Sequence, residues 1–308
     1  MKAVIVNSQG SFDDILIQEI AKPLMKENEL LVKVHAAGVN PVDFKVVLHG
    51  YFPRPLILGS DIAGTVEAVG NDVKNFKPGD EIIGSLEWHK QSAFAEYVAT
   101  QEKYITYKPA NLTFTEAAGI PLAALTAWQA LFDKLHLQKG QKIVIHAAAG
   151  GVGLFAVQLA KWAGAYVIGT ASERNRDFLL SAGADEVVDY TKYKLSEKVT
   201  GADAVLDTIS TPEVQEESFK SLKRNGEYVS IVSTNVPVDE TLLAKYEVHA
   251  QKFLFQSDAD QLKKIVQLIE EGHVKVFIDK TFPLKDARAA MEYLYTARAR
   301  GKVILTTN

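Results

Sequence analysis

The sequence of 308 residues contains no cysteine. Disulfide bonds, thiolate zinc sites and cysteine nucleophiles are therefore excluded together. The seven histidines are scattered, without the H-x-x-H or H-E-x-x-H spacing that places two imidazoles on one face of a helix. No metal site is therefore expected, and any catalysis has to rely on other groups.

Long hydrophobic runs and an excess of basic charge are also absent. The net charge is -4 and the pI is near 6.0, without a long basic run, so neither nucleic acid nor an anionic membrane is expected as a partner. No segment approaches eighteen apolar residues, and the apolar run near Met1 is too short for a signal peptide. We expect a soluble, cytoplasmic protein that is long enough for two domains.

One stretch is organised as a nucleotide-binding unit. Residues 142–172 read KIVIHAAAGGVGLFAVQLAKWAGAYVIGTAS, which predicts a strand, a glycine-rich turn, a helix over 152–162 and a second strand. In such a turn, backbone N–H groups approach a pyrophosphate at the positive end of the helix. The spacing is Ala147-x-x-Gly150-x-x-Gly153, so the first glycine of G-x-G-x-x-G is missing. The cofactor-binding residues expected here are Ala149, Gly150, Gly151, Val152 and Gly153.

The rest of the chain shows two patterns of secondary structure. Residues 1–115 read as short strands separated by proline and glycine, with no convincing long helix, which favours a β-barrel-like domain. After Ser172, apolar strands alternate with helical stretches, as in an α/β protein with a doubly wound parallel sheet. Asp258 is a good N-cap for an amphipathic helix, and two β-like pieces follow, at 276–278 and 302–305.

The end of the second strand decides the choice of cofactor. A carboxylate there accepts hydrogen bonds from the adenosine ribose and repels a 2′-phosphate. The chain has Ala171 at this point, and the side chains of Ser172, Arg174 and Asn175 are donors that suit a phosphate. Glu173 lies beyond the strand, where a solvated carboxylate favours a helix N-terminus. NADPH is therefore the expected cofactor.

A longer pattern carries a family resemblance. The segments GSDIAGTVEAVG at 59–70 and KPGDEI at 77–82, with the glycine turn, resemble the medium-chain dehydrogenase/reductase superfamily, in particular its zinc-independent, ζ-crystallin-like quinone oxidoreductase branch. The resemblance implies a Rossmann doubly wound parallel sheet inserted into a GroES-like, β-barrel-type catalytic domain. We expect the catalytic domain at 1–118, the NADP-binding domain at 119–256 and a return to the catalytic domain at 257–308. A homodimer is implied as well.

The family resemblance also bears on whether the chain binds a catalytic zinc ion. Zinc alcohol dehydrogenases carry a ligand cysteine in G-V-C-x-x-D and a histidine in G-H-E, whereas this chain has Asn40 and Ser60 at those positions. A neutral amide and a hydroxyl are poor zinc ligands. The resemblance therefore implies catalysis without zinc.

The resemblance also suggests residues close to the reacting groups. Asn40 and Thr126 match positions near the nicotinamide, and Tyr190 matches a tyrosine beside the 2′-phosphate. Tyr51 lies near a cleft tyrosine of the family and would donate a hydrogen bond to a developing oxyanion, so Tyr51 and Asn40 are the catalytic candidates. Alternatively, Asn40 only closes a turn before proline, and both tyrosines are ordinary surface residues. Trp88 and His89 are further candidates for the wall of the cleft.

These observations predict an NADPH-dependent, zinc-independent reductase that passes a hydride to a quinone or to an α,β-unsaturated carbonyl, in a cleft between the domains. Two alternatives stay open. One is an alkenal or enoyl-thioester reductase of the same fold, which only a substrate panel separates from the first. The other is a non-catalytic NADPH-binding protein with a sensing, structural or nucleic-acid-binding role, since no proton donor is evident in the sequence.

Overall fold

The computed structural model describes residues 1–8, 10–87, 91–232 and 237–307. The chain forms two compact units: unit 1 consists of Met1–Leu125, Ser257–Gly272 and Val276–Asn308, and unit 2 consists of Thr126–Gln256 and His273–Lys275. We expected the first boundary after residue 118, whereas it falls after Leu125, inside helix α3 (Pro121–Trp128). The first turn of α3 is tied to unit 1, because the backbone N–H of Leu122 donates to Asp61 Oδ1 at 3.0 Å.

Unit 2 is built on a six-stranded sheet in which every neighbouring pair is parallel. The spatial order is β11-β10-β9-β12-β13-β14. Counted from the first strand, this is the order 3-2-1-4-5-6 of dinucleotide-binding sheets, so the predicted doubly wound fold is confirmed. The strands are β9 (Lys142–Ile145), β10 (Tyr166–Ala171), β11 (Glu186–Asp189), β12 (Ala202–Asp207), β13 (Leu222–Ser230) and β14 (His249–Lys252).

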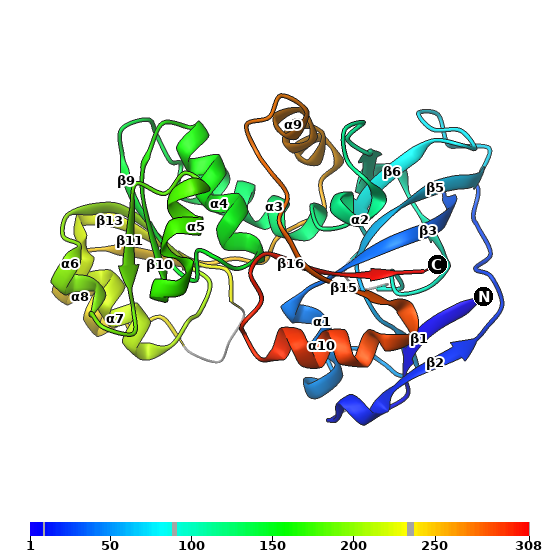
Figure 1. The fold of residues 1–308 in the computed structure, drawn as a ribbon, viewed down its shortest axis with the longest axis horizontal. Coiled ribbons are helices and arrows are strands. Elements are labelled where there is room, and N and C mark those ends of the chain that lie inside the picture. The colour runs from blue at the N-terminus through cyan, green and yellow to red at the C-terminus, as the bar shows by residue number, and fades with distance from the viewer. Residues whose placement is uncertain (9, 88–90, 233–236, 308) are drawn as a thin grey trace. The chain divides into compact units, whose positions relative to one another are not determined.

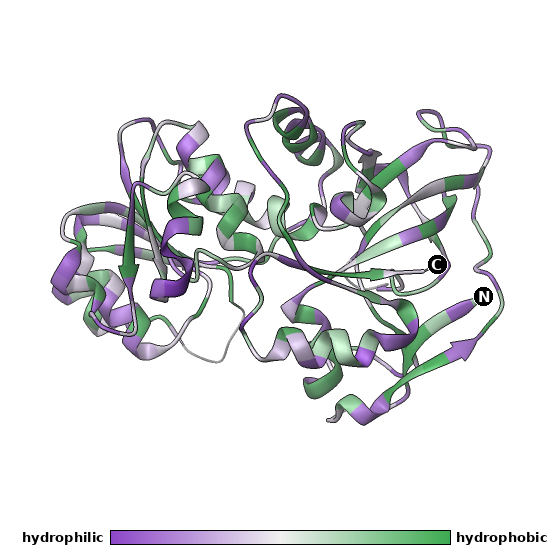
Figure 2. Cartoon of the chain, in the orientation of Figure 1, coloured by the Kyte–Doolittle hydropathy of each residue, from purple (hydrophilic) through white to green (hydrophobic). Residues whose placement is uncertain are grey.

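The helices of unit 2 differ in how deeply they are buried. In α4 every residue from Gly153 to Ala160 is buried, as expected for the helix that follows the central strand. Figure 2 shows α4 as largely hydrophobic and α6 as more hydrophilic. The helices are α4 (Gly151–Trp162), α5 (Arg176–Ser181), α6 (Leu195–Lys198), α7 (Pro212–Ser221) and α8 (Glu240–Tyr246), with a π-helical stretch at Gln129–Lys134 and a 3-10 turn at Glu173–Asn175.

Unit 1 contains a seven-stranded sheet in the order β15-β16-β3-β5-β6-β8, with β7 paired to β3, and a three-stranded sheet in the order β2-β1-β4. Among the described strands of unit 1, only β15 and β16 are parallel neighbours; the other pairs are antiparallel. This arrangement confirms the predicted GroES-like type of domain. The strands are β1 (Lys2–Val6), β2 (Ile15–Glu19), β3 (Leu30–Val39), β4 (Leu56–Ile57), β5 (Asp61–Val69), β6 (Glu81–Ser85), β7 (Tyr97–Thr100), β8 (Ile105–Tyr107), β15 (Ile278–Pro283) and β16 (Lys302–Thr306).

Unit 1 also contains helices that the sequence pattern did not predict. Helix α1 (Pro41–His49) begins after Asn40, whose N–H donates to Asp43 Oδ2 at 2.7 Å, and ends at Gly50 with φ 69°. From the sequence we expected Pro41 to separate strands, but proline also fits the first position of a helix. The remaining helices are α2 (Phe114–Ala117), α9 (Ala259–Glu270) and α10 (Ala287–Tyr295), and 3-10 turns lie at Phe12–Asp14, Glu102–Tyr104 and Leu284–Asp286.

Two of these helices bear on the predictions for the C-terminal part. Asp258 caps α9 as predicted, since its side chain accepts from the N–H of Gln261 at 2.8 Å. Helix α10 was not foreseen; Figure 1 shows it below β15 and β16, next to α1. None of the described helices is both long enough and apolar enough to span a lipid bilayer.

Candidate functional site

The glycine turn joins β9 to α4 in unit 2. Its first motif position is occupied by Ala147, which takes the left-handed conformation with φ 44°. The N–H of Gly150 donates to the carbonyl of Ala147 at 2.9 Å and closes the turn. A non-glycine residue in this conformation costs roughly 1–2 kcal/mol, so the alanine keeps the glycine-type geometry at a modest loss of stability.

The helix begins so close to the turn that no side chain fits between them. A Cβ added to Gly153 would lie 2.5 Å from the carbonyl oxygen of Ala147 and 2.7 Å from Ala148 Cα. The N–H groups of Gly151, Val152 and Gly153 belong to the first helical turn and have no partner within the helix. Such a helix start, next to bare backbone, suits the negative charge of a pyrophosphate.

A cavity of about 400 Å³ lies in unit 2 where β9, β10, β11 and β12 end. Ligands of doubly wound sheets bind outside the carboxyl ends of the strands. Tyr190, a candidate for the 2′-phosphate, lines the cavity and is 63% exposed. The other lining residues are His146, Thr170, Val188, Thr191, Lys192, Tyr193, Lys194, Leu195, Ile209, Glu213, Val214 and Glu217.

His146 lines this cavity, and both of its ring nitrogens have a hydrogen-bonding partner. Its Nδ1 lies 3.1 Å from Thr170 Oγ1 and its Nε2 lies 2.9 Å from Ser218 Oγ. Burial lowers the pKa of His146, although Asp207 acts in the opposite direction. A neutral imidazole with both nitrogens engaged has a structural role, and we assign it no chemistry.

At the end of β10 the side chains become exposed and polar. Ala171 is the last, buried residue of the strand, and a 3-10 turn carrying Glu173 and Arg174 follows Ser172. Glu173 is not simply solvated, as we had expected, because its Oε2 lies 3.2 Å from Lys192 Nζ.

Lys192 was not a candidate from the sequence. Its Nζ lies between Glu173 and Asp189, whose Oδ2 is 3.4 Å away. The hydrogen bond to Glu173, which has the larger effect, and the one to Asp189 raise the pKa of Lys192, so it is a cation at neutral pH. We call Glu173, Asp189 and Lys192 the rim cluster. Only the position of Lys192 two residues after Tyr190 could have suggested it.

In unit 1 the structure surrounds Asn40 with charged side chains. Asn40 is 1% exposed; its Nδ2 donates to Asp61 Oδ2 at 2.9 Å and to the carbonyl of Gly38 at 3.3 Å. Its Oδ1 accepts a hydrogen bond from Lys302 Nζ. We call Asn40, Asp43, Asp61 and Lys302 the buried cluster, since all four side chains are nearly or fully inaccessible to solvent.

Burial shapes the electrostatics of this cluster. It raises the pKa of Asp43 to about 8, against a hydrogen bond from the N–H of Asn40 and the charge of Lys302, while Asp61 adds to the rise. Burial likewise raises the pKa of Asp61 and lowers that of Lys302, whereas the attraction between these two favours both charged forms. At neutral pH, Asp43 is therefore mainly protonated and Lys302 is paired with Asp61.

The buried cluster does not suit a zinc ion. Asn40 Oδ1 already faces the ammonium of Lys302, which would repel a metal cation. Ser60 is 1% exposed and offers only a hydroxyl. Across residues 1–8, 10–87, 91–232 and 237–307, no group of three or more His, Cys, Asp or Glu side chains could hold a metal ion.

The remaining candidates come from different parts of the chain. Tyr51 follows Gly50 and is 56% exposed, with its ring 6.1 Å from that of His49, and its hydroxyl bonds to no described residue. Nine-residue α1 lies between Tyr51 and Asn40 in the chain, and nine helical residues span about 14 Å. Thr126 is buried in α3 and belongs to unit 2. Trp88 and His89 are outside the described residues.

Comparison with known proteins agrees with this architecture. Residues 26–110 match the alcohol dehydrogenase GroES-like domain, and residues 182–305 match a family described as zinc-binding dehydrogenase. The chain is 36% identical to 2-methylene-furan-3-one reductase of Solanum lycopersicum, over 99% of this chain and 79% of that protein.

Solved structures give the same result. The quinone oxidoreductase of Coxiella burnetii is similar with a TM-score of 0.93 and 33% identity, over 100% of this chain and 99% of that one. The quinone oxidoreductase of Escherichia coli, in complex with NADPH, is similar with a TM-score of 0.91 and 28% identity, over 99% of this chain and 100% of that one. The chain is thus an oxidoreductase that belongs to the medium-chain dehydrogenase/reductase superfamily, in its quinone oxidoreductase branch.

Proposed function

We propose that the protein is an NADPH-dependent, zinc-independent reductase of quinones and α,β-unsaturated carbonyls. The observation that carries the proposal is the turn between β9 and α4, where Gly153 leaves no room for a side chain and the helix start opens at the strand ends. The NADPH in the E. coli structure and the enone substrate in the name of the tomato relative support it. A homodimer and a cytoplasmic location remain predictions from the sequence.

Unit 2 supplies the groups that would hold the cofactor. The N–H groups of Gly151, Val152 and Gly153, with Ala149 and Gly150 beside them, would hold the pyrophosphate. Ser172, Arg174, Asn175 and Tyr190 would hold the 2′-phosphate through donors, and the cation of Lys192 adds to their attraction. Ala171 brings no carboxylate that would repel this phosphate.

The chemistry of the bound cofactor is hydride donation, and the protein has to orient the acceptor and stabilise the negative charge that develops on its oxygen. Tyr51 is the candidate for this stabilisation, because no described residue engages its hydroxyl. Asn40 has a different part: both hydrogens of its amide are already donated, to Asp61 and Gly38. We propose that Asn40 and Thr126 shape the surroundings of the nicotinamide and that Tyr51 is the donor to the acceptor.

The test is a panel of quinones, enones, alkenals and enoyl thioesters, with cofactor oxidation followed in the presence of NADPH or NADH. We expect turnover with a quinone or an enone, and a higher kcat/KM for NADPH than for NADH. Tyr51→Phe should lower kcat with little effect on the KM for NADPH, because the hydroxyl acts on the acceptor. Absence of turnover with every acceptor, or equal use of both cofactors, would contradict the proposal.

A further inference from the structure

Lys302 is a lysine without access to solvent, at the start of β16. It is 4% exposed. Its Nζ donates to Asn40 Oδ1 and to the carbonyl of Val39 at 3.3 Å, and lies 3.8 Å from Asp61 Oδ2. Lysine is almost never fully buried unless it is paired, and burial of the pair costs free energy of hydration. Its contacts should therefore explain why the charge is kept inside unit 1.

Those contacts allow the amide of Asn40 only one orientation. A side-chain amide has an acceptor on one side and two donors on the other. In the observed orientation, the oxygen faces the ammonium of Lys302, and the nitrogen faces the carboxylate of Asp61. Rotation of the amide by half a turn would place NH₂ against the ammonium and oxygen against the carboxylate. Both contacts would become repulsive, so the ion pair selects the orientation.

The same bonds hold the chain that leads into α1. The backbone N–H of Asn40 is bound to Asp43, and the backbone carbonyl of Val39 is bound to Lys302. The end of β3 and the first turn of α1 are thereby fixed from both sides of Asn40. A small displacement of residues that align reactants can lower a rate about 100-fold.

We propose that Lys302 is a positioning residue of the reductase, which acts through Asn40 by fixing the orientation of its amide and the start of α1. The inference rests on the proposed function, in which Asn40 shapes the surroundings of the nicotinamide. Lys302 itself is not expected to touch the cofactor or the acceptor.

The single variant Lys302→Met leaves Asp61 as an unpaired buried carboxylate and is at risk of not folding. The double variant Asp61→Asn with Lys302→Met avoids this problem, because it is neutral and of nearly unchanged volume. With its oxygen held by the N–H of Leu122, the amide at position 61 would turn its NH₂ toward Asn40, which suits the rotated orientation of the Asn40 amide. The double variant therefore no longer selects the observed orientation of Asn40. It also removes the hydrogen bonds that Lys302 donates to Asn40 and to the carbonyl of Val39.

We expect the double variant to fold with a smaller loss of Tm than the single variant and with a similar KM for NADPH, while kcat falls about 100-fold. A second readout does not depend on activity. The side-chain amide of Asn40, assigned by comparison with Asn40→Ser in ¹⁵N-asparagine-labelled protein, should exchange slowly with solvent in the wild type and lose this protection in the double variant. A kcat within about twofold of the wild type would overturn the inference.

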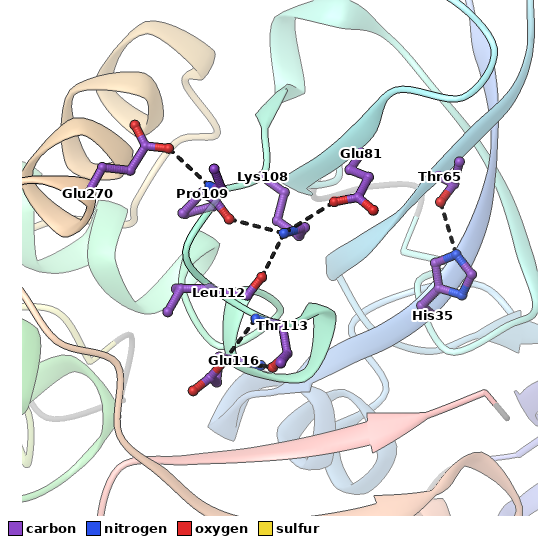
Figure 3. A network of polar contacts seen from close by, with 10 residues as sticks. His35, Thr65, Glu81, Lys108, Pro109, Leu112, Thr113, Glu116 and Glu270 are labelled. Atoms are coloured by element: carbon purple, nitrogen blue, oxygen red, sulfur yellow. Dashed lines mark hydrogen bonds and ion pairs between the residues drawn. The ribbon is translucent and has the colours of Figure 1, made fainter.

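Lys108 offers a matched control in unit 1. Its side chain is 6% exposed; its Nζ donates to the carbonyls of Pro109 and Leu112 at 3.0 and 2.6 Å and lies 3.2 Å from Glu81 (Figure 3). Lys108→Met should lower the Tm and leave kcat unchanged, because none of these partners belongs to the proposed site. An equal loss of kcat in this control would reduce Lys302 to a general requirement for stability.

The experiment also separates the two levels of the proposal. If none of the tested acceptors supported oxidation of NADPH by the wild type, the proposed function would fail. The exchange of the Asn40 amide would still test the role of Lys302. Unchanged protection of that amide in the double variant would overturn the inference independently of any turnover.

Discussion

Each of the two clusters pairs a lysine with two carboxylates, but the lysine is buried in one cluster and exposed in the other. In the buried cluster, Lys302 and Asp61 have side chains that are 4% and 0% exposed. In the rim cluster, Lys192 and Glu173 are 55% and 54% exposed. Water screens the exposed pair and lets either partner exchange for a ligand. The buried pair has no such alternative, since each charge depends on the other.

This difference separates two tasks in the proposed function. A charge that has to orient a neighbouring side chain is effective where water cannot replace it. A charge that has to accept a phosphate needs to be accessible and weakly held. Both clusters contain lysine, aspartate and a hydrogen-bonding neighbour, so the residue types alone do not distinguish these tasks. The burial of the lysine distinguishes them.

The largest expected effect concerns stability. Lys302→Met should lower the free energy of unfolding by about 3–5 kcal/mol, because the carboxylate of Asp61 is left buried without its cation. Lys192→Met should change it much less, since Lys192 and Glu173 are exposed to water, and Asp189, though 3% exposed, still accepts from the N–H and the hydroxyl of Thr191. Urea unfolding of the two variants measures the contrast. Similar losses of stability in both would show that burial is not the decisive difference.

The second prediction uses the pKa of Asp43, which burial raises to about 8 in the folded protein. Between pH 4 and 8 the folded state keeps a proton on Asp43 that the unfolded state has released, so this group makes stability fall as pH rises. The slope reaches at most about 1.4 kcal/mol per pH unit. The groups that act on Asp43 are Asp61, Lys302 and the N–H of Asn40.

Asp43→Asn should remove this slope, since asparagine is neutral throughout and its oxygen can still accept from the N–H of Asn40. Unfolding by urea at pH 5 and pH 8 should show a smaller difference in the variant than in the wild type. Asp177→Asn, on the exposed side of α5, serves as the control and should retain the difference. A wild-type slope preserved in Asp43→Asn would contradict the assignment.

Local patterns in the sequence predicted what depends on neighbouring residues. The glycine turn and the N-cap at Asp258 follow from residues within one or two turns of each other. The parallel sheet follows from the alternation of strands and helices along the chain. Helix α1 was missed because a nine-residue helix that starts with proline gives the same signal as a loop.

The buried cluster could not be predicted, because it is assembled by the register of three strands. Strand β16 pairs with β3 so that Val303 lies opposite Val39, and β3 pairs with β5 so that Gly38 lies opposite Asp61. Lys302 and Asn40 adjoin the first pair, and Asp61 is a member of the second. Asp43 lies in the first turn of α1. In the sequence, Lys302 merely precedes an apolar strand, and nothing there connects it with Asn40.

A third prediction tests whether the exposed region reads the 2′-phosphate. Arg174→Ala should raise the KM for NADPH roughly ten- to a hundredfold, the range of a lost hydrogen bond to a charged group. The KM for NADH should hardly change, because NADH lacks that phosphate. Steady-state kinetics with both cofactors and one acceptor gives the result. Equal increases for both cofactors would place Arg174 outside the phosphate site.

The smallest expected effect comes from Glu173, whose carboxylate holds Lys192 in the absence of a ligand. Glu173→Gln removes a negative charge beside the proposed phosphate site and releases the ammonium of Lys192 to the cofactor. The KM for NADPH should therefore fall a few-fold, with that for NADH unchanged, and the gain should shrink as salt is added. The matched control is Asp185→Asn. Asp185 is paired with Lys161 at a distance of 2.5 Å, and neither residue lines the cavity. An increase of the KM for NADPH in Glu173→Gln would mean that Glu173 positions Lys192 for the phosphate instead of competing for it.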